Sequence, residues 1–235
     1  MLRPALADRE GGALFIGTPQ GFNHFHQLVE SAEGQPDWQV FQFTTAEGGN
    51  VSLKELESAA QELDERTYLQ EFEAKFQTMG VGRVITPFDR VHSVKNYRSD
   101  PHRESCWSLD FNTNPLCSVI AQVHEKGGIV VLEELILPDS NTLAACEEFL
   151  SRTEKCFTGV PLCVRVYGDS TGEQRRTSAS RTVKEFFGRY PDRFSVTFRV
   201  PSANPPVKDR VNCVNAKLRN HTGQYRLFVN PGCRL

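Results

Sequence analysis

One stretch decides how this chain is expected to fold: Ser108-Leu109-Asp110-Phe111-Asn112-Thr113-Asn114-Pro115, which is followed by the apolar run 116–123. Its aspartate, Asp110, lies at the end of a short apolar segment. A second apolar segment ends in the same way, at Val164-Arg165-Val166-Tyr167-Gly168-Asp169-Ser170. Two strands that each deliver one aspartate can form a hard-cation site, because Mg²⁺ and Mn²⁺ take carboxylate oxygens together with waters and substrate phosphates. Asp110 and Asp169 are therefore the main candidates for metal ligands.

Length, charge and cysteine content narrow the class of protein. The 235 residues suffice for one large domain, or for one domain with part of another. With 27 basic and 29 acidic residues, the net charge of -2 argues against a global nucleic-acid footprint but leaves room for a local one. Seven cysteines without a C-x-x-C pair predict a reduced, intracellular protein with no structural zinc. No apolar run is long enough for a membrane span, and the start has no signal-peptide pattern.

The first part of the chain reads as strand, loop and helix. Residues 13–16 are a predicted strand that breaks at Gly17-Thr18-Pro19-Gln20-Gly21, and residues 22–30 have the apolar spacing of a helix. Such a unit can present backbone N–H groups to phosphate. The loop lacks the Gly-Lys-Ser/Thr ending of a P-loop, however, so the residues alone favour an ordinary connection.

The next elements in this first part are a strand and two helices. Residues 38–44 alternate as a strand does. Ser52 and Glu55 have the spacing of a capping box, which predicts a helix beginning at residue 53. A second helix is predicted from about residue 65 to residue 76, and its aromatic stripe is more typical of core packing than of a ligand site.

A polar segment, 87–103, reads as a linker, and strands dominate beyond it. Residues 107–111 and 116–123 are predicted as one strand, bulged around 112–115, and Gly127-Gly128 is a hairpin turn into a strand at 129–137. The remaining expected elements are a helix after Ser140 or Asn141, a strand at 160–167, a helix at 181–190, a strand at 194–200, a helix at 208–218 and a strand at 225–229. This β-β-α-β-α-β order makes the strands that carry Asp110 and Asp169 neighbours, with both aspartates at one edge of the sheet.

Such a pair is suited to phosphodiester hydrolysis. A carboxylate that bridges two ions holds them about 3.5–4 Å apart, so that one ion activates water and the other stabilises the leaving 3′ oxygen. The alternative is that both aspartates are turn formers, which are common at strand ends. Glu134, in the middle of a strand, is a weaker ligand candidate. Asp209 fits better as a carboxylate at a helix start.

A local basic cluster follows Asp169. Its members are Arg175, Arg176 and Arg181. A solvated face is one interpretation, and contact with a nucleic-acid backbone beside the metal site is the other.

Three stretches together resemble the large subunit of the terminase, the DNA-packaging motor of tailed phages. They are Ala13-Leu14-Phe15-Ile16-Gly17-Thr18-Pro19-Gln20-Gly21, Ser108-Leu109-Asp110-Phe111-Asn112-Thr113-Asn114-Pro115 and Tyr167-Gly168-Asp169-Ser170, which occur in the family's order and at similar intervals. The resemblance implies that Gly17, Thr18, Pro19 and Gly21 belong to the motif that couples ATP hydrolysis to DNA movement. It also implies that Asp110 and Asp169 are metal ligands of the nuclease.

The same resemblance implies a fold and a division into domains. Residues 1–86 would be the C-terminal part of a P-loop-type packaging ATPase domain, 87–103 a linker, and 104–235 an RNase H-like nuclease domain with a mixed α/β sheet flanked by helices. No Gly-x-x-x-x-Gly-Lys-Ser/Thr motif precedes residue 13, so ATP is expected as a ligand of the full-length protein alone. A third acidic ligand is expected beyond Leu235.

The expected activity is a Mg²⁺- or Mn²⁺-dependent endonuclease that cuts double-stranded concatemeric DNA during packaging. The resemblance implies a portal protein and a small terminase subunit as partners, and the cytoplasm of an infected bacterial host as the location. Two alternatives remain open: another RNase H-like nuclease such as a resolvase, or a catalytically inactive module that docks DNA or a portal.

Overall fold

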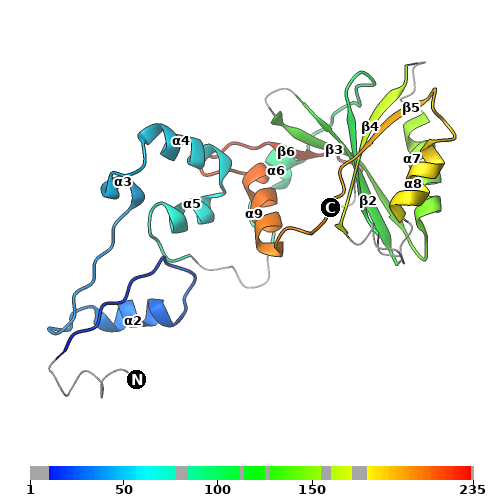
Figure 1. Ribbon diagram of the computed structural model, residues 1–235. Helices are drawn as coiled ribbons and strands as arrows, with labels where there is room; N and C mark the ends of the chain where they lie inside the picture. The colour runs from blue at the N-terminus through cyan, green and yellow to red at the C-terminus, as the bar shows by residue number, and fades with distance from the viewer. Residues whose placement is uncertain are drawn as a thin grey trace. The chain divides into compact units, whose positions relative to one another are not determined.

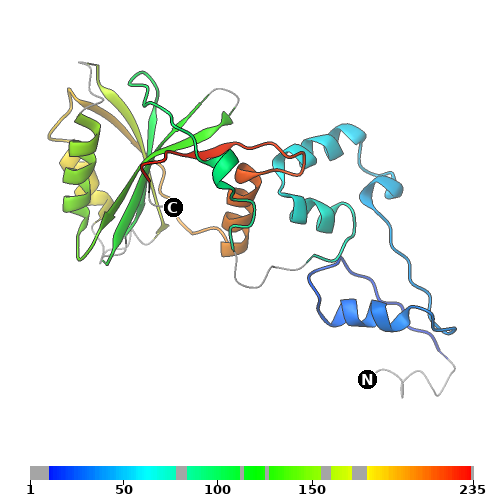
Figure 2. The same ribbon diagram turned by 180° about the vertical axis from the view of Figure 1, so that it is seen from behind.

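A computed structural model describes residues 11–77, 84–111, 114–124, 127–154, 160–170 and 179–233, and it divides the chain into two compact units. The first unit is Met1–Val84 and the second is Ile85–Leu235. Figures 1 and 2 show the sheet of the second unit from two sides. In the part of the chain that the structure describes, no helix has the length and apolarity that crossing a membrane requires.

The second unit is built on a mixed sheet of six strands in the order β5-β4-β1-β2-β3-β6. The strands are β1 (Ser105–Asp110), β2 (Leu116–Val123), β3 (Ile129–Leu137), β4 (Leu162–Gly168), β5 (Phe194–Phe198) and β6 (Leu227–Val229). Strands β1, β2 and β3 form an antiparallel meander, whereas β4 is parallel to β1, β5 to β4 and β6 to β3. An antiparallel meander continued by parallel strands beside its first strand is the RNase H-like arrangement, so the predicted fold class is confirmed for this unit.

One predicted strand is in fact two. β1 and β2 are antiparallel neighbours, with Asp110 opposite Cys117, rather than one bulged strand. The chain therefore reverses its direction between Asp110 and Leu116. Asn and Pro at this place are typical of a turn, and the apolar runs on either side carry no signal that distinguishes a bulge from a reversal.

Two helices cover one face of this sheet. They are α7 (Thr142–Thr153) and α8 (Ala179–Phe187), and the core lies between them and the strands. Trp107 is completely buried there, with its ring 4.4 Å from that of Phe149 and 6.0 Å from that of Phe187. Its indole N–H donates to Ser118 Oγ at 3.0 Å, so the polar atom is satisfied. Asn141, one of the two caps that the sequence allowed, begins α7 by accepting from the backbone N–H of Ala144.

Two further helices, α6 (Arg90–Ser93) and α9 (Val207–Leu218), contact β6. Figures 1 and 2 show them on the side of the sheet away from α7 and α8. The segment 87–103, expected to be a linker, belongs to the second unit, contains α6 and is hydrogen-bonded to the end of β6. The N–H of Lys95 donates to the carbonyl of Val229 at 3.1 Å, and that of Tyr97 donates to Asn230 Oδ1 at 2.9 Å.

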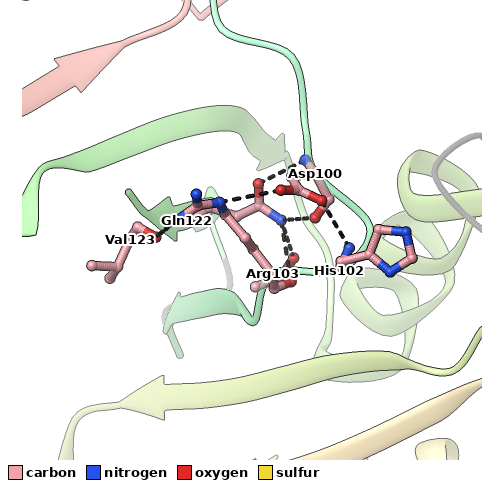
Figure 3. Close-up of polar contacts among 6 residues, drawn as sticks. Asp100, His102, Arg103, Gln122 and Val123 are labelled. Atoms are coloured by element: carbon pink, nitrogen blue, oxygen red, sulfur yellow. Dashed lines mark hydrogen bonds and ion pairs between the residues drawn. The ribbon is translucent and has the colours of Figure 1, made fainter. Parts of the chain in front are cut away.

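A buried glutamine fixes the end of this segment to the sheet (Figure 3). The side chain of Gln122 donates to the carbonyl of Asp100 at 2.8 Å and accepts from the N–H of Asp100 at 3.0 Å. The N–H of His102 donates to the carboxylate of Asp100, and Arg103 lies beside it; the hydrogen bond from His102 is the main cause that lowers the pKa of Asp100. These bonds lie at the edge of the sheet where β1 begins.

The first unit is helical where the structure describes it. Its helices are α2 (His24–Ala32), α3 (Thr45–Gly48), α4 (Leu53–Glu62) and α5 (Glu65–Glu71). Ser52 accepts from the N–H of Glu55 and so caps α4 as predicted, while a complete capping box that the sequence reading missed joins Thr44 to Glu47. The helix expected to reach residue 76 ends at Glu71. Its aromatic stripe does pack, since Tyr68 is buried and stacks on Phe72.

The strands predicted at residues 13–16 and 38–44 are not formed. Both segments lie within the described range 11–77, which contains no strand. Their apolar side chains line one open pocket together with residues of α2, and the rings of Phe15 and Trp38 stack 6.1 Å apart. A strand requires a hydrogen-bonded neighbour, and alternation in sequence does not supply one.

Candidate active site

The sheet places Asp110 and Asp169 at adjoining positions. Strands β1 and β4 are adjacent and parallel, and Leu109 is the register partner of Gly168. Asp110 is the last residue of β1, and Asp169 directly follows the end of β4. Because the carboxyl ends of parallel neighbours meet at one edge, with about 4.8 Å between strands, the next residue on each strand carries its carboxylate to that edge.

The face of the sheet that Asp110 occupies is the one that α7 and α8 leave uncovered. Side chains alternate along a strand, and Trp107 and Leu109 point into the core. Ser108 and Asp110 therefore point to the opposite face, and both are exposed, while Asp169 is half-buried. A ligand thus has access to the two carboxylates from the side opposite α7 and α8.

A close contact between the two strand ends fixes their spacing. A Cβ atom added to Gly168 would lie 2.5 Å from Cε2 and 2.8 Å from Cζ of Phe111. No side chain other than hydrogen fits there unless the ring moves. Phe111 follows Asp110 directly and Gly168 precedes Asp169, so the ring of one site segment rests on the backbone of the other. This contact gives a physical reason for glycine in the Tyr167-Gly168-Asp169 stretch.

Two residues near this edge were missed by the sequence reading. Asn204 Oδ1 accepts from the backbone N–H of Ser170 at 2.8 Å, which holds the chain just after Asp169. Arg199 follows β5, donates its backbone N–H to the carbonyl of Val166 at 2.8 Å, and is exposed. The sequence does show a basic residue at the end of a predicted strand. It does not show that this strand lies beside β4, so Arg199 could not be assigned to the site.

A charged pair lies further along the same face. Arg165 of β4 forms an ion pair with Glu104 at 2.6 Å. A hydrogen bond to Tyr167, reinforced by the charge of Glu104, raises the pKa of Arg165. The guanidinium therefore stays charged, and it stands two residues before Tyr167 on the strand that leads to Asp169.

Glu134 shares the face of Asp110 but stands apart from the pair. It lies opposite Val119 on β2, which in turn lies opposite Ser108 on β1. Two strand spacings and two residues along the strand separate it from Asp110, which is about 12 Å between Cα atoms for ordinary strand geometry. Glu133 points to the other face and pairs with Arg152 at 3.2 Å. Among the described residues, no group of three or more His, Cys, Asp or Glu side chains is arranged to hold a metal ion.

The loop Gly17 to Gly21 leads into α2. Pro19 is buried, Thr18 is exposed, and a Cβ on Gly17 would be in ordinary contact with the ring of Phe25 at 3.7 Å. Gly21 has a φ of 64°, which favours glycine. At the start of α2 the side chain of Asn23 accepts from two backbone N–H groups, those of Phe25 and His26. These two N–H groups already have a hydrogen-bond acceptor, so they are not available to bind a phosphate.

The remaining predicted site residues are dispersed. Arg175 and Arg176 lie outside the described residues. Arg181 lies on α8 and pairs with Glu185 at 2.7 Å. Asp209 stands in the first turn of α9, as expected of a helix-start carboxylate.

Comparison with known proteins relates the sequence and the fold of this chain to phage terminases. No protein-family model matches the sequence. Over 103 residues, or 43% of this chain and 23% of the relative, the chain is 28% identical to the large terminase subunit of Escherichia phage T5. The solved large terminase of a thermophilic bacteriophage matches with a TM-score of 0.57 at 17% identity, covering 98% of this chain and 55% of the other. The same terminase solved with ADP gives a TM-score of 0.58 at 15% identity, covering 92% and 50%.

The strand order defines the second unit as RNase H-like, and the match to the thermophilic phage terminase extends over both units. In sequence and in fold, the chain is similar to part of a phage terminase large subunit, so the resemblance predicted from the three stretches is confirmed. The chain spans about half the length of the solved terminases that it matches.

Proposed function

We propose that the second unit is a metal-dependent endonuclease that cuts double-stranded DNA during phage genome packaging. The observation that supports this most directly is the adjoining position of Asp110 and Asp169 at the ends of parallel strands, on the face opposite α7 and α8. The similarity to terminase large subunits supplies the packaging context. Arg199, whose backbone is hydrogen-bonded to β4 near the same edge, is proposed to contact the phosphate backbone.

The two carboxylates fit a hard divalent cation. Mg²⁺ and Mn²⁺ bind through one or two carboxylates, waters and substrate phosphates, so a pair of aspartates is a suitable protein contribution. Asp110 and Asp169 would hold the ion, which supplies Lewis-acid stabilisation of the phosphodiester and an activated water. The chain's own part is to keep the two carboxylates at a fixed spacing through the Phe111–Gly168 contact, and to hold the segment after Asp169 through Asn204.

For the whole protein we propose ATP-driven DNA translocation, with Gly17, Thr18, Pro19 and Gly21 in the coupling motif. A portal protein and a small terminase subunit are the partners proposed with it, in the cytoplasm of an infected bacterium. The domain division at residues 1–86, 87–103 and 104–235 belongs to this proposal.

Nicking of supercoiled plasmid with Mn²⁺ tests the nuclease. We expect nicking that falls to background in Asp110→Asn and in Asp169→Asn, and we expect Mn²⁺ binding, measured by titration calorimetry, to weaken in both. Glu134→Gln is the matched control, because it removes a carboxylate from the same face at a distance and should leave both readouts largely intact.

Two results would redirect the proposal. Absence of both cleavage and Mn²⁺ binding would favour an inactive module that docks DNA or a portal. Strong preference for a four-way junction over linear duplex would favour a resolvase.

A further inference from the structure

Positive charge is concentrated in one stretch of this otherwise balanced chain. Between residues 201 and 233 there are five basic side chains and a single carboxylate, that of Asp209, whereas the whole chain has a net charge of -2. All five lie on α9 or directly beside α9 or β6, and the contacts described below bring together three of them: Arg210, Lys217 and Arg226. These three are called the α9–β6 basic patch.

The patch stands on rigid elements. Arg210 and Lys217 are seven residues apart on α9, which is two helical turns and about 10 Å on one side of the helix. Arg226 lies beside Lys217, since its backbone N–H donates to the carbonyl of Lys217 at 2.7 Å. Arg226 directly precedes β6, which pairs with β3, so the helix and the sheet hold the three side chains in place. Arg210 is exposed, and the other two are half-buried.

The charges of the patch are not neutralised within the part of the chain that the structure describes. No carboxylate there forms an ion pair with Arg210, Lys217 or Arg226, and the guanidinium of Arg226 donates to the neutral amide of Gln224. Two arginines on the helices α7 and α8 differ. Arg152 pairs with Glu148, and Arg181 pairs with Glu185. Unpaired cations on one side raise the local potential and attract polyanions.

The patch and the two aspartates share one side of the sheet. Asp110 points away from α7 and α8, and α9 also lies on the side away from those helices (Figures 1 and 2). Asp110 lies opposite Cys117 of β2, and the patch lies at the level of Val123, six residues further along that strand. Across the sheet, β6 is three strands from β1. Ordinary strand geometry puts the patch about 25 Å from Asp110. That is about seven base pairs of duplex, at about 3.4 Å for each.

We propose that the α9–β6 basic patch binds the phosphate backbone of double-stranded DNA about seven base pairs from the bond at Asp110 and Asp169. The proposal rests on the proposed nuclease function. It adds a second contact that is remote from the carboxylates and that fixes the direction in which the duplex leaves the cleavage edge. Such contacts position DNA without reading its sequence.

Binding of a fluorescent 20-base-pair duplex, measured by anisotropy in EDTA at several salt concentrations, tests the patch without cleavage. The variant Arg210→Gln/Lys217→Gln/Arg226→Gln should bind about 10- to 100-fold more weakly, and the slope of log K against log salt should fall by about 3, because each lost phosphate contact removes about 0.9. The matched control is Lys184→Gln/Arg189→Gln/Arg193→Gln, which makes the same change in charge on α8 and the loop after it. Circular dichroism establishes that both variants are folded.

The outcomes separate the patch from the nuclease. Equal loss of binding in the two variants, or no DNA binding by the parent chain, would overturn the patch. Patch-dependent binding by a chain that neither binds Mn²⁺ nor nicks plasmid would keep the patch and reject the proposed nuclease. Nicking that persists in the patch variant at saturating DNA, with binding weakened as expected, supports both.

Discussion

The two units of this chain differ in how far their large apolar side chains are buried. In the second unit Trp107, Phe149 and Val183 are completely buried between the sheet and the helices α7 and α8. In the first unit Ile16 is 86% exposed and Phe43 is 69% exposed. Both regions have sequences that alternate as strands do, yet strands form in the second alone among the described residues. An alternating sequence therefore shows that a segment is able to form a strand. Whether its apolar side chains become buried depends on a neighbouring strand with which it can form hydrogen bonds.

The helix starts, in contrast to the apolar side chains, are alike in the two units. α2, α4 and α5 of the first unit each begin at a side-chain cap, from Asn23, Ser52 and Asp64, just as α7 of the second unit begins at Asn141. A cap requires only residues within one turn. Helix starts are thus equally well specified in both units, whereas the apolar core belongs mainly to the second.

The largest expected effect comes from emptying that core. Trp107→Ala should destabilise the second unit by about 3–5 kcal/mol, because it leaves a cavity and removes the indole N–H that donates to Ser118 Oγ. Hydrogen exchange measured by mass spectrometry would show lost protection in β1, β2 and β4. Phe43→Ala in the first unit is the control and should change stability by less than about 0.5 kcal/mol. Equal effects would mean that the contrast between the units is wrong.

An intermediate effect is expected at the contact between the two strand ends. Gly168→Ala forces its Cβ against the ring of Phe111, and overpacking of this kind costs about 1–3 kcal/mol. A shift of the carboxylates by about 1 Å would lower cleavage about 100-fold. Phe111→Ala in the same chain makes room for the methyl group, so Gly168→Ala should cost less stability in that background than in the parent chain. Additive losses in a double-mutant cycle would show that the ring is not the obstacle.

The smallest effect is expected at the helix caps. Asn141→Ala removes the acceptor for the N–H of Ala144, and Ser52→Ala removes the acceptor for the N–H of Glu55. Each should cost about 1 kcal/mol, measured as local loss of exchange protection in the first turn of α7 and of α4. The two losses should be similar because caps act locally. A cost confined to Asn141 would indicate that α4 depends on contacts beyond its own turn.

The sequence predicts the elements of the second unit closely. The strand ranges 116–123 and 129–137 match the structure, and the helix at 208–218 begins one residue earlier. The single strand expected from residue 107 to 123 was wrong because a reversal and a bulge have the same pattern of apolar residues. The strands at 13–16 and 38–44 were wrong because no periodicity reveals whether a neighbour exists.

The candidate site was predictable only in part. Two apolar runs that each end in aspartate indicated Asp110 and Asp169, and their expected position at one edge of the sheet followed from an assumed strand order. The contact of Phe111 with Gly168 could not be predicted, because it joins residues from different strands. The α9–β6 basic patch could have been found from the sequence, because residues 201–233 contain five basic residues and one acidic residue. The near-neutral charge of the whole chain concealed this local excess.

The parallel pairing of β1 with β4 has a consequence for how the site forms. Asp110 and Asp169 are 59 residues apart in the chain, with β2, β3 and α7 between them. The meander β1–β2–β3 closes through short reversals, whereas β4 reaches β1 across a long loop, and long loops close slowly. We expect the meander to fold first with a single aspartate in place. The pair of carboxylates then comes together only when β4 joins β1, so chains in which the meander alone has folded contain no complete site.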